Sequence, residues 1–337
     1  MAEPGAGNTV YPLTFEPVFR DYIWGGRRLE TLLGRRLPPG IVAESWEISG
    51  HPDSPTRVAS GFWRGHTLPE VVAQMGLDLV GTHSAGLLAR GRFPLLVKLL
   101  DANQDLSVQV HPDDAYAAAN ERGEIGKAEM WYVLYAEPGY ELIHGVKPGV
   151  SPAQFRAAID RGNVADLLNY VRVSPGDVID IPAGTIHALL AGAVVAEIQQ
   201  TSDVTYRVHD WGRVGQDGTP RPLHIDRAMD VIDFDRPSRV PTPPQPITKT
   251  DSLCREILVS RPQFTTERLL LAPGATYRGR CDGSSLEIWG CMAGDCSIAW
   301  AGEPLTLAAL RFVLLPAALG RFTITCGQRS TLLRVYV

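Results

Sequence analysis

Short runs of β-branched and aromatic residues, separated by Gly, Pro and Asp, dominate the chain. Runs of this kind predict strands joined by turns, so we expect a mainly β protein. In residues 106–111, apolar side chains alternate with Ser107, Gln109 and His111. Because successive side chains of a strand point to opposite faces, this alternation predicts a strand with three polar groups on one face.

Helical patterns are fewer and shorter. Residues 68–76 and 112–123 each predict a few helical turns, the second with acidic residues in its first turn, where they favour the helix dipole. A third helix is predicted after Ser151, which is followed by Pro and Gln in the pattern of a capping box. With a further short helix over 164–170, these signals predict a helical insert over about residues 149–170.

A second polar cluster has the pattern G-x5-P-x-G-x2-H, formed by Gly176, Pro182, Gly184 and His187. Glycine and proline favour a tight turn, which would aim the histidine back across a sheet. The spacing resembles the second motif of the cupin superfamily, whose members are small jelly-roll β-barrels that hold a metal near one mouth. Ala191 stands where that motif ends in Asn.

A candidate metal-ligating set follows from the two clusters and the run between them. Glu129 begins a strand-like run in which it shares a face with Trp131 and Val133. Two imidazoles, a carboxylate and an amide oxygen suit one Zn²⁺ per chain and are compatible with Mn²⁺, Fe²⁺ or Co²⁺. The alternative is that each polar residue caps a turn or faces solvent. The candidate ligands are Gln109, His111, Glu129 and His187.

The pattern predicts two jelly-roll (cupin) β-barrels with a short helical insert. Residues 1–235 would form the catalytic, metal-binding cupin domain, with N-terminal strands and the insert. Residues 236–249 carry five prolines, which exclude a helix or a central strand and predict a linker. Residues 250–337 alternate like strands but contain no histidine, which predicts a metal-free, cupin-like C-terminal β domain.

Composition narrows the class of protein. The chain has 337 residues, 45% of them hydrophobic, and a formal net charge of −5. No basic block suggests nucleic acid, and no apolar run approaches the roughly 20 residues that span a bilayer. The start lacks the pattern of a signal peptide, so we expect a cytoplasmic protein, and we expect a monomer. The five cysteines include no C-x-x-C pair, which favours reduced, buried thiols over a disulfide framework or a thiolate zinc site.

The chain resembles the type I phosphomannose isomerases over most of its length. LSVQVHPDD and the Thr205-Tyr206-Arg207 run are specific to this family among cupins. The chain resembles the compact prokaryotic branch, because it lacks the Asn-His pair that longer members carry before the glutamate ligand. The matching segments are WGGRRL (24–29), AESWEISGHPDSP (43–55), PLLVKLLDANQDLSVQVHPDD (94–114), GKAEMWYVL (126–134), IPAGTIHAL (181–189) and EIQQTSDVTYRVHDW (197–211).

The resemblance implies an aldose-ketose isomerase that interconverts mannose 6-phosphate and fructose 6-phosphate through an enediolate. It also implies that the four candidate ligands bind zinc and that Arg207 is catalytic. Such a reaction needs a base, cationic groups for the developing oxyanion and an anchor for the phosphate. Glu197 matches a family glutamate and is the first candidate for the base, with Asp203 and Lys127 as alternatives.

Ser107 and Lys98 are the candidates for binding the phosphate. Ser107 shares a face with the ligands, and Lys98 stands in an apolar run where a buried ammonium would need an anion. The alternative for Lys98 is that it snorkels to solvent. His51 matches a family segment near the active site, although an HPD turn is also ordinary loop chemistry. Asp203 completes the substrate-binding candidates.

Two other functions are compatible with the fold. A non-catalytic cupin that senses sugar phosphates would bind ligand without turnover. A cupin oxidoreductase using Fe or Mn would carry an H-x-H pair where this chain has Gln109-Val110-His111. Turnover tests the first alternative, and metal content tests the second.

Overall fold

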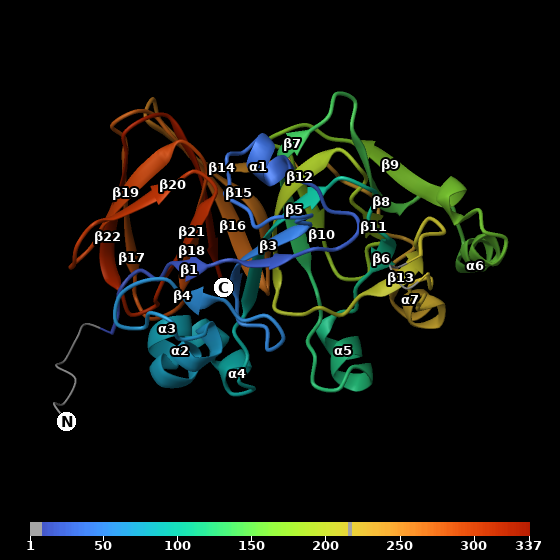
Figure 1. Cartoon of the computed structure of the whole chain (residues 1–337), viewed down its shortest axis with the longest axis horizontal. Coiled ribbons are helices and arrows are strands. Elements are labelled where there is room, and N and C mark those ends of the chain that lie inside the picture. The colour runs from blue at the N-terminus through green and yellow to red at the C-terminus, as the bar shows by residue number, and fades with distance from the viewer. Residues whose placement is uncertain (1–8, 215–217) are drawn as a thin grey trace. The chain divides into compact units, whose positions relative to one another are not determined.

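Strands are the main elements of the protein, which confirms the predicted mainly β class (Figure 1). The computed structural model describes residues 9–214 and 218–337. Residues 1–8, part of the start on which the expectation about a signal peptide rests, lie outside these ranges. In the described ranges the sheets are open, with two edge strands each, and none closes into a barrel. None of the helices there is both long enough and apolar enough to cross a bilayer.

The chain separates into two compact units, neither of which is continuous in sequence. Unit 1 comprises residues 1–18, 46–96 and 244–337, and unit 2 comprises residues 19–45 and 97–243. The chain passes from unit 2 to unit 1 inside the stretch that the sequence predicts as a linker. Residues 46–96 group with the C-terminal strands rather than with the predicted catalytic domain.

Unit 2 contains two sheets and the whole stretch predicted as a helical insert, residues 149–170. Strands β2 (Val18–Arg20), β3 (Glu44–Ser49) and β5 (Leu95–Ala102) each include a unit boundary. The other strands of unit 2 are β6 (Val108–Val110), β7 (Glu129–Ala136), β8 (Glu141–Val146), β9 (Leu168–Arg172), β10 (Val178–Ile181), β11 (His187–Ala188), β12 (Ala193–Gln200) and β13 (Tyr206–His209). One sheet has the strand order β10-β7-β12-β5-β3-β2, and the other has the order β13-β6-β11-β8-β9.

All but the first of the helices of unit 2 contribute side chains to the buried cluster on one face of the five-stranded sheet. The helices of unit 2 are α1 (Arg28–Thr31), α5 (Asp114–Asn120), α6 (Pro152–Asp160), η2 (Val164–Leu167) and α7 (Ile225–Val231). Val108 and Val110 of β6 point into one buried cluster with Phe155 of α6 and Ala228 of α7. Because side chains alternate along a strand, Gln109 between the two valines points to the opposite face, toward the second sheet.

The space between the two sheets of unit 2 has an apolar part and a polar part. Trp131, Val133 and Val195 pack into one buried cluster on the inner face of the six-stranded sheet. Glu129 of β7 shares that face with Trp131, as predicted, and lies 3.1 Å from His187 of the facing sheet. The polar part therefore forms where β6, β7 and β11 approach one another.

Unit 1 is a second β structure with its own core. Its strands are β1 (Phe15–Glu16), β4 (Arg57–Val58), β14 (Gln245–Lys249), β15 (Leu253–Arg261), β16 (Phe264–Leu271), β17 (Thr276–Cys281), β18 (Glu287–Ala293), β19 (Asp295–Ala299), β20 (Leu305–Ala308), β21 (Arg311–Leu315), β22 (Gly320–Cys326) and β23 (Ser330–Tyr336). They form sheets of order β14-β15-β16-β23-β18-β21 and β17-β22-β19-β20, besides the pair β1-β4. Trp289 and Phe322, which belong to different sheets, meet edge to face in the core.

The helices of unit 1 are α2 (Leu68–Met75), α3 (Leu77–Val80), η1 (Thr82–Ser84) and α4 (Ala85–Leu88). The predicted helix at 68–76 is confirmed as α2, that at 112–123 as the shorter α5, and that after Ser151 as α6 with its capping box. The prediction for 164–170 is wrong in part, because η2 ends at Leu167 and β9 begins at Leu168. Part of the predicted linker is the edge strand β14.

Candidate active site

Strand register brings the polar residues of the five-stranded sheet into one row. His187 of β11 lies opposite Gln109 of β6, and Gln109 lies opposite Arg207 of β13. Residues directly opposite one another on neighbouring strands project to the same face. The row therefore places an imidazole, an amide and a guanidinium side by side, facing the second sheet.

The two candidate histidine ligands are held in one tautomer by backbone carbonyls. The Nδ1 of His111 lies 2.8 Å from the carbonyl oxygen of Val204, and that of His187 lies 2.9 Å from the carbonyl oxygen of Thr185. A carbonyl only accepts, so each Nδ1 carries the proton and donates. Each Nε2 is left with a lone pair, the arrangement that metal-ligating histidines adopt.

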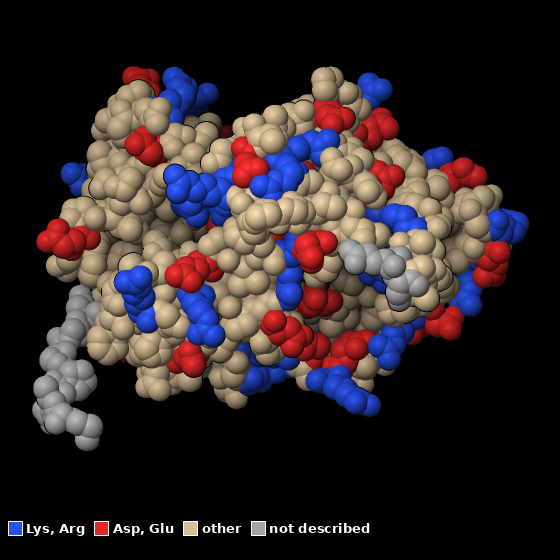
Figure 2. All heavy atoms as spheres, viewed as in Figure 1, with Lys and Arg blue, Asp and Glu red and all other residues tan. Residues whose placement is uncertain are grey.

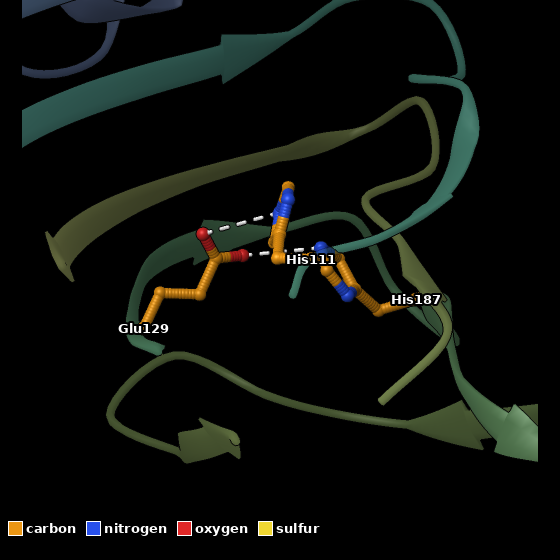
Figure 3. Close-up of side chains that lie close together, drawn as sticks. All are labelled: His111, Glu129 and His187. Carbon is orange, nitrogen blue, oxygen red and sulfur yellow. Dashed lines mark ion pairs between the residues drawn. The ribbon is translucent and has the colours of Figure 1, made fainter. Parts of the chain in front are cut away.

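The carboxylate of Glu129 lies close to both of these Nε2 atoms (Figure 3). Its Oε1 lies 3.1 Å from Nε2 of His187, and its Oε2 lies 3.6 Å from Nε2 of His111. The ligand atoms of the three residues all lie within 4.8 Å of one another, and all three side chains are buried. Neither carboxylate oxygen has a hydrogen bond of normal geometry. Two imidazole nitrogens and a carboxylate that converge in this way fit a divalent cation.

Lys127 supplies a positive charge beside this cluster. Its ammonium lies 2.8 Å from Oε2 of Glu129 and 3.1 Å from Nε2 of His111. Burial opposes the charge of Glu129, but the neighbouring Lys127 ammonium outweighs it and holds the pKa of Glu129 well below its usual value. Burial together with the same ammonium lowers the pKa of His111 well below its usual value. The carboxylate is therefore ionised and the imidazole neutral, as metal ligation requires.

Gln109 reaches the cluster through its amide. Its Nε2 lies 3.5 Å from Nε2 of His187, and its Oε1 accepts a hydrogen bond of 3.2 Å from the Ser107 hydroxyl. A ligand role uses the amide oxygen, so it requires a half-turn of the amide group. The alternation predicted for residues 106–111 holds within β6 but not beyond it, because Leu106 packs in the cluster between the sheets.

The cluster lies beside a cavity of about 300 Å³ whose lining residues all belong to unit 2. This volume is at the lower end of the range for small-molecule sites. The lining combines aromatic, acidic and basic side chains, with four cationic groups against three carboxylates. The residues are Tyr22, Trp24, Glu44, Lys98, Leu100, Leu106, Ser107, Gln109, Lys127, Trp131, Glu197, Asp203, Thr205, Arg207 and Arg221.

Glu197 is buried in this wall and held by two partners. Its Oε2 accepts a 2.7 Å hydrogen bond from the indole N–H of Trp131, and its Oε1 lies 3.4 Å from the Lys98 ammonium. Burial and the charge of Glu129 raise the pKa of Glu197. A carboxylate with a raised pKa and a fixed orientation suits a general base.

Lys98 does not snorkel to solvent. It is buried, and its ammonium lies 3.6 Å from Oε2 of Glu44 as well as near Glu197. Burial opposes its charge, but these two carboxylates outweigh burial and raise the pKa of Lys98. The negative charge that a buried Lys98 ammonium needs is therefore supplied by carboxylates of the protein itself. The sequence did not predict a role for Glu44, although Glu44 stands in one of the segments that match the isomerase family.

Arg207 projects into the cavity with part of its guanidinium unpaired. Its NH1 donates to the carbonyl of Pro222 at 3.0 Å, whereas its buried Nε has no hydrogen bond. A second arginine, Arg221, lines the same wall and was not predicted. Arg221 donates two hydrogen bonds to Asp210, of 2.8 and 2.5 Å. Burial and the charge of Arg221 lower the pKa of Arg207.

The remaining candidates divide between the two units. Asp203 and Ser107 line the cavity, as expected for substrate-binding residues. His51 belongs to unit 1 and is not among the lining residues. Its ring packs edge-on against Trp46, and its Nδ1 accepts a hydrogen bond from the backbone of Asp53. These contacts agree with the alternative stated for His51, which is a residue of an ordinary HPD turn.

Comparison with known families gives one match. The family described as phosphomannose isomerase type I, catalytic domain, matches residues 13–134. That range contains Gln109, His111 and Glu129 together with Lys98, but not His187, Glu197 or Arg207.

Several curated proteins are similar over most of the chain. A probable mannose-6-phosphate isomerase from Bacillus subtilis (strain 168) is 42% identical over 233 residues, which cover 69% of this chain and 72% of that protein. A mannose-6-phosphate isomerase from Streptococcus mutans is 40% identical over 254 residues, or 75% and 77% of the two chains. The crystal structure of the mannose 6-phosphate isomerase from Bacillus subtilis superimposes with a TM-score of 0.86 and 32% identity, covering 97% of this chain and 99% of that one.

Proposed function

The chain belongs to the type I phosphomannose isomerases, and on that premise we propose that its cavity interconverts mannose 6-phosphate and fructose 6-phosphate. The reaction moves a proton between C1 and C2 of the sugar through an enediolate. One observation carries the proposal: the His111, Glu129 and His187 ligand atoms converge beside a cavity that also presents Glu197 and Arg207. The paired sheets of each unit support a cupin-type, jelly-roll origin for both halves of the chain.

A divalent metal, which we propose to be zinc, would be held by the Nε2 atoms of His111 and His187, the Glu129 carboxylate and the Gln109 amide oxygen. When bound, such an ion polarises oxygens of the sugar and orients them. The donor set contains no thiol and two neutral imidazoles, which suits Zn²⁺ and accepts Mn²⁺, Co²⁺ or Fe²⁺. The tautomers that Val204 and Thr185 impose support this assignment.

Glu197 is the group that we propose to move the proton. The Trp131 indole and the Lys98 ammonium each hold one of its oxygens, so its orientation is fixed without closing it off from the cavity. Its raised pKa makes Glu197 a stronger base for the removal of a proton from a sugar carbon. Asp203, on the same cavity wall, is the alternative base.

Arg207 and Lys127 would hold the negative charge that develops on the sugar oxygens. Arg207 stands in the row that contains Gln109 and His187, so its guanidinium lies on the ligand side of the cavity. Charged donors fixed in a water-poor site stabilise a developing oxyanion because they need no reorganisation. The Lys127 ammonium, already beside Glu129, lies at the same end of the site.

We assign the phosphate to Arg221 and Ser107 rather than to Lys98. The Lys98 ammonium is compensated by two buried carboxylates. Arg221 lines the cavity with a guanidinium that Asp210 orients through two hydrogen bonds. A fork of this kind matches phosphate oxygens in pairs. Location in the cytoplasm and a monomeric state stay predictions from the sequence.

The test is a coupled assay of fructose 6-phosphate formation from mannose 6-phosphate, before and after treatment with a chelator. We expect activity to be lost with the metal and restored by Zn²⁺, Co²⁺ or Mn²⁺. The variants His111→Ala and His187→Ala should lose metal and activity together while the fold survives, since the core of unit 2 does not depend on the ligands. Full activity in protein shown by elemental analysis to be metal-free would refute the metal centre, and ligand binding without turnover would favour the sensor.

A further inference from the structure

One turn, residues 182–185, bonds to both candidate histidine ligands. The amide of Gly184 donates a 2.9 Å hydrogen bond to the carbonyl of His111. One residue later, the carbonyl of Thr185 accepts from Nδ1 of His187 at 2.9 Å. The position of this turn therefore sets where both imidazoles stand.

The opposite side of the turn is bonded to the segment that follows α7. The amide of Asp233 donates to the carbonyl of Gly184 at 2.9 Å. The NH1 of Arg236 donates to the carbonyl of Ala183 at 2.7 Å and to Oγ1 of Thr185 at 2.9 Å, with the Pro182 carbonyl at 3.4 Å. Arg236 and Asp233 also form an ion pair of 2.9 Å. One guanidinium thus spans almost the whole turn.

Packing alone does not hold the turn on this side. A cavity of about 260 Å³ is lined by Ala183 and Gly184 together with Asp233 and Arg236. The backbones nevertheless approach closely, because a Cβ on Gly184 would stand 2.8 Å from the Val231 carbonyl oxygen. Across a gap of this kind, hydrogen bonds rather than apolar contacts define the position of the turn.

The segment that supplies these bonds is itself anchored. Phe234, between Asp233 and Arg236, packs against Phe155 of α6 with ring centroids 5.5 Å apart. Both rings belong to the cluster that covers the outer face of the five-stranded sheet. Asp233 and Arg236 are therefore held in place by the packing of Phe234 against α6.

We propose that Arg236, oriented by Asp233, is a positioning residue of the metal centre, acting on His187 through Thr185 and on His111 through Gly184. The inference rests on the metal centre proposed above. Arg236 stands in the stretch that the sequence predicts as a mere linker, so the proposal gives that stretch a function. Outer partners that orient metal ligands change metal affinity or activity by about 10- to 100-fold when removed.

The test is the zinc dissociation constant of the full-length protein, measured by competition with a chromophoric chelator. Arg236→Ala should weaken zinc binding by about 10- to 100-fold. Arg236→Lys should recover part of the loss, because an ammonium can pair with Asp233 but cannot span Ala183 and Thr185. Arg239→Ala is the matched control, an exposed arginine three positions away, and should bind zinc like the wild type.

Two further readouts separate positioning from general destabilisation. The visible spectrum of the Co²⁺-substituted protein should change in Arg236→Ala, since the spectrum reports ligand geometry. The variants should also be compared after chelation, where Arg236→Ala and the wild type should melt within a few degrees of each other. In a cycle with Thr185→Val, the two losses of zinc affinity should not add, because both variants remove the same hydrogen bond.

The outcomes distinguish this inference from the proposed function. If the wild type binds no zinc, the metal centre is wrong and Arg236 has nothing to position. If the wild type binds zinc and Arg236→Ala binds it equally well with an unchanged Co²⁺ spectrum, the metal centre stands and the role of Arg236 is refuted. A loss in Arg236→Ala that Arg239→Ala shares would also refute it.

Discussion

At the residue scale, the cavity is governed by how its buried charges compensate one another. Lys98 lies between the carboxylates of Glu44 and Glu197, and Lys127 lies against Glu129. Buried charges are tolerated when each has an opposite partner at hydrogen-bond distance, and removing one partner leaves the other uncompensated. Arg207 differs from these residues, because its buried Nε has no hydrogen bond and its charge is directed into the cavity.

This difference allows binding of metal and chemistry to be separated at Arg207. Arg207→Ala removes no ligand, so zinc content and stability should stay close to those of the wild type. The kcat value should fall roughly a hundredfold or more, the usual loss when a donor to a developing oxyanion is deleted. Arg207→Lys should recover only part of that activity, because a point charge does not reproduce the guanidinium fork. A rise in KM with kcat intact would instead show that Arg207 binds the substrate and the transition state equally strongly, and is not catalytic.

His144 gives the protein a specific dependence of stability on pH. Its Nε2 donates to the Asp180 carbonyl and its Nδ1 accepts from the Ser238 hydroxyl, both at 3.0 Å, so the neutral ring is satisfied. Burial lowers the pKa of His144 to about 4. The unfolded chain, with a pKa near 6.5, then binds the proton first as pH falls, so stability is full above about pH 6.5 and declines toward pH 4.

Between pH 7.5 and pH 5 this group alone should cost about 2 kcal/mol of unfolding free energy. His144→Gln, which does not titrate there, should lose about that much less over the same interval. The measurement is urea unfolding of both proteins in chelator, which removes the separate pH dependence of metal binding. Parallel losses in the two proteins would show that His144 is not the group responsible.

At the element scale, the sequence predicted on which face of a strand a side chain lies better than it predicted which strands lie side by side. Alternation correctly placed Gln109 opposite the valines of β6, and Glu129 with Trp131 on β7. It did not predict that Arg207, Gln109 and His187 share a row, because register between strands distant in sequence depends on turns and packing that no local pattern records. Helix α7 was missed for a related reason, since much of its stability comes from packing on the sheet.

Where the local signal is strong, an element can be tested by its own chemistry. In α6 the Ser151 side chain accepts from the amide of Gln154, and the Gln154 side chain accepts from the amide of Ser151. Ser151→Ala should lower the free energy of unfolding by about 1 kcal/mol, because an N-cap acceptor is lost. Ser151→Asp, which keeps an acceptor, should stay near the wild type. Urea unfolding measures both, and equal stability of the alanine variant would show that the box contributes nothing here.

At the scale of the whole molecule, chain order and compact units do not coincide. The Pro-rich stretch marks the change from unit 2 to unit 1 at residues 243 and 244, near where the sequence expected a boundary. The grouping of residues 46–96 with the C-terminal strands had no local signal, because it depends on contacts between segments far apart in sequence. Acidic and basic side chains are interspersed on the face shown in Figure 2. The cavity has its own set of charged side chains, four cationic and three acidic.

The charge of the cavity lining bears on how the protein selects its substrate. The chain carries a formal net charge of −5, whereas the cavity lining has an excess of cationic side chains. A phosphorylated sugar therefore needs the local cations, and kcat/KM for mannose 6-phosphate should far exceed that for mannose, because remote binding energy helps to position the reacting carbons.

Arg221→Ala should lower kcat/KM for mannose 6-phosphate by about 10- to 100-fold, the range expected for lost charge-assisted hydrogen bonds, and should leave mannose nearly unaffected. Arg213→Ala is the matched control, because Arg213 pairs with the same Asp210 without lining the cavity. An equal fall for both substrates in Arg221→Ala, or an equal loss in Arg213→Ala, would mean that Arg221 only supports the wall through Asp210. The phosphate would then have to be bound by Ser107 and the remaining cations of the cavity.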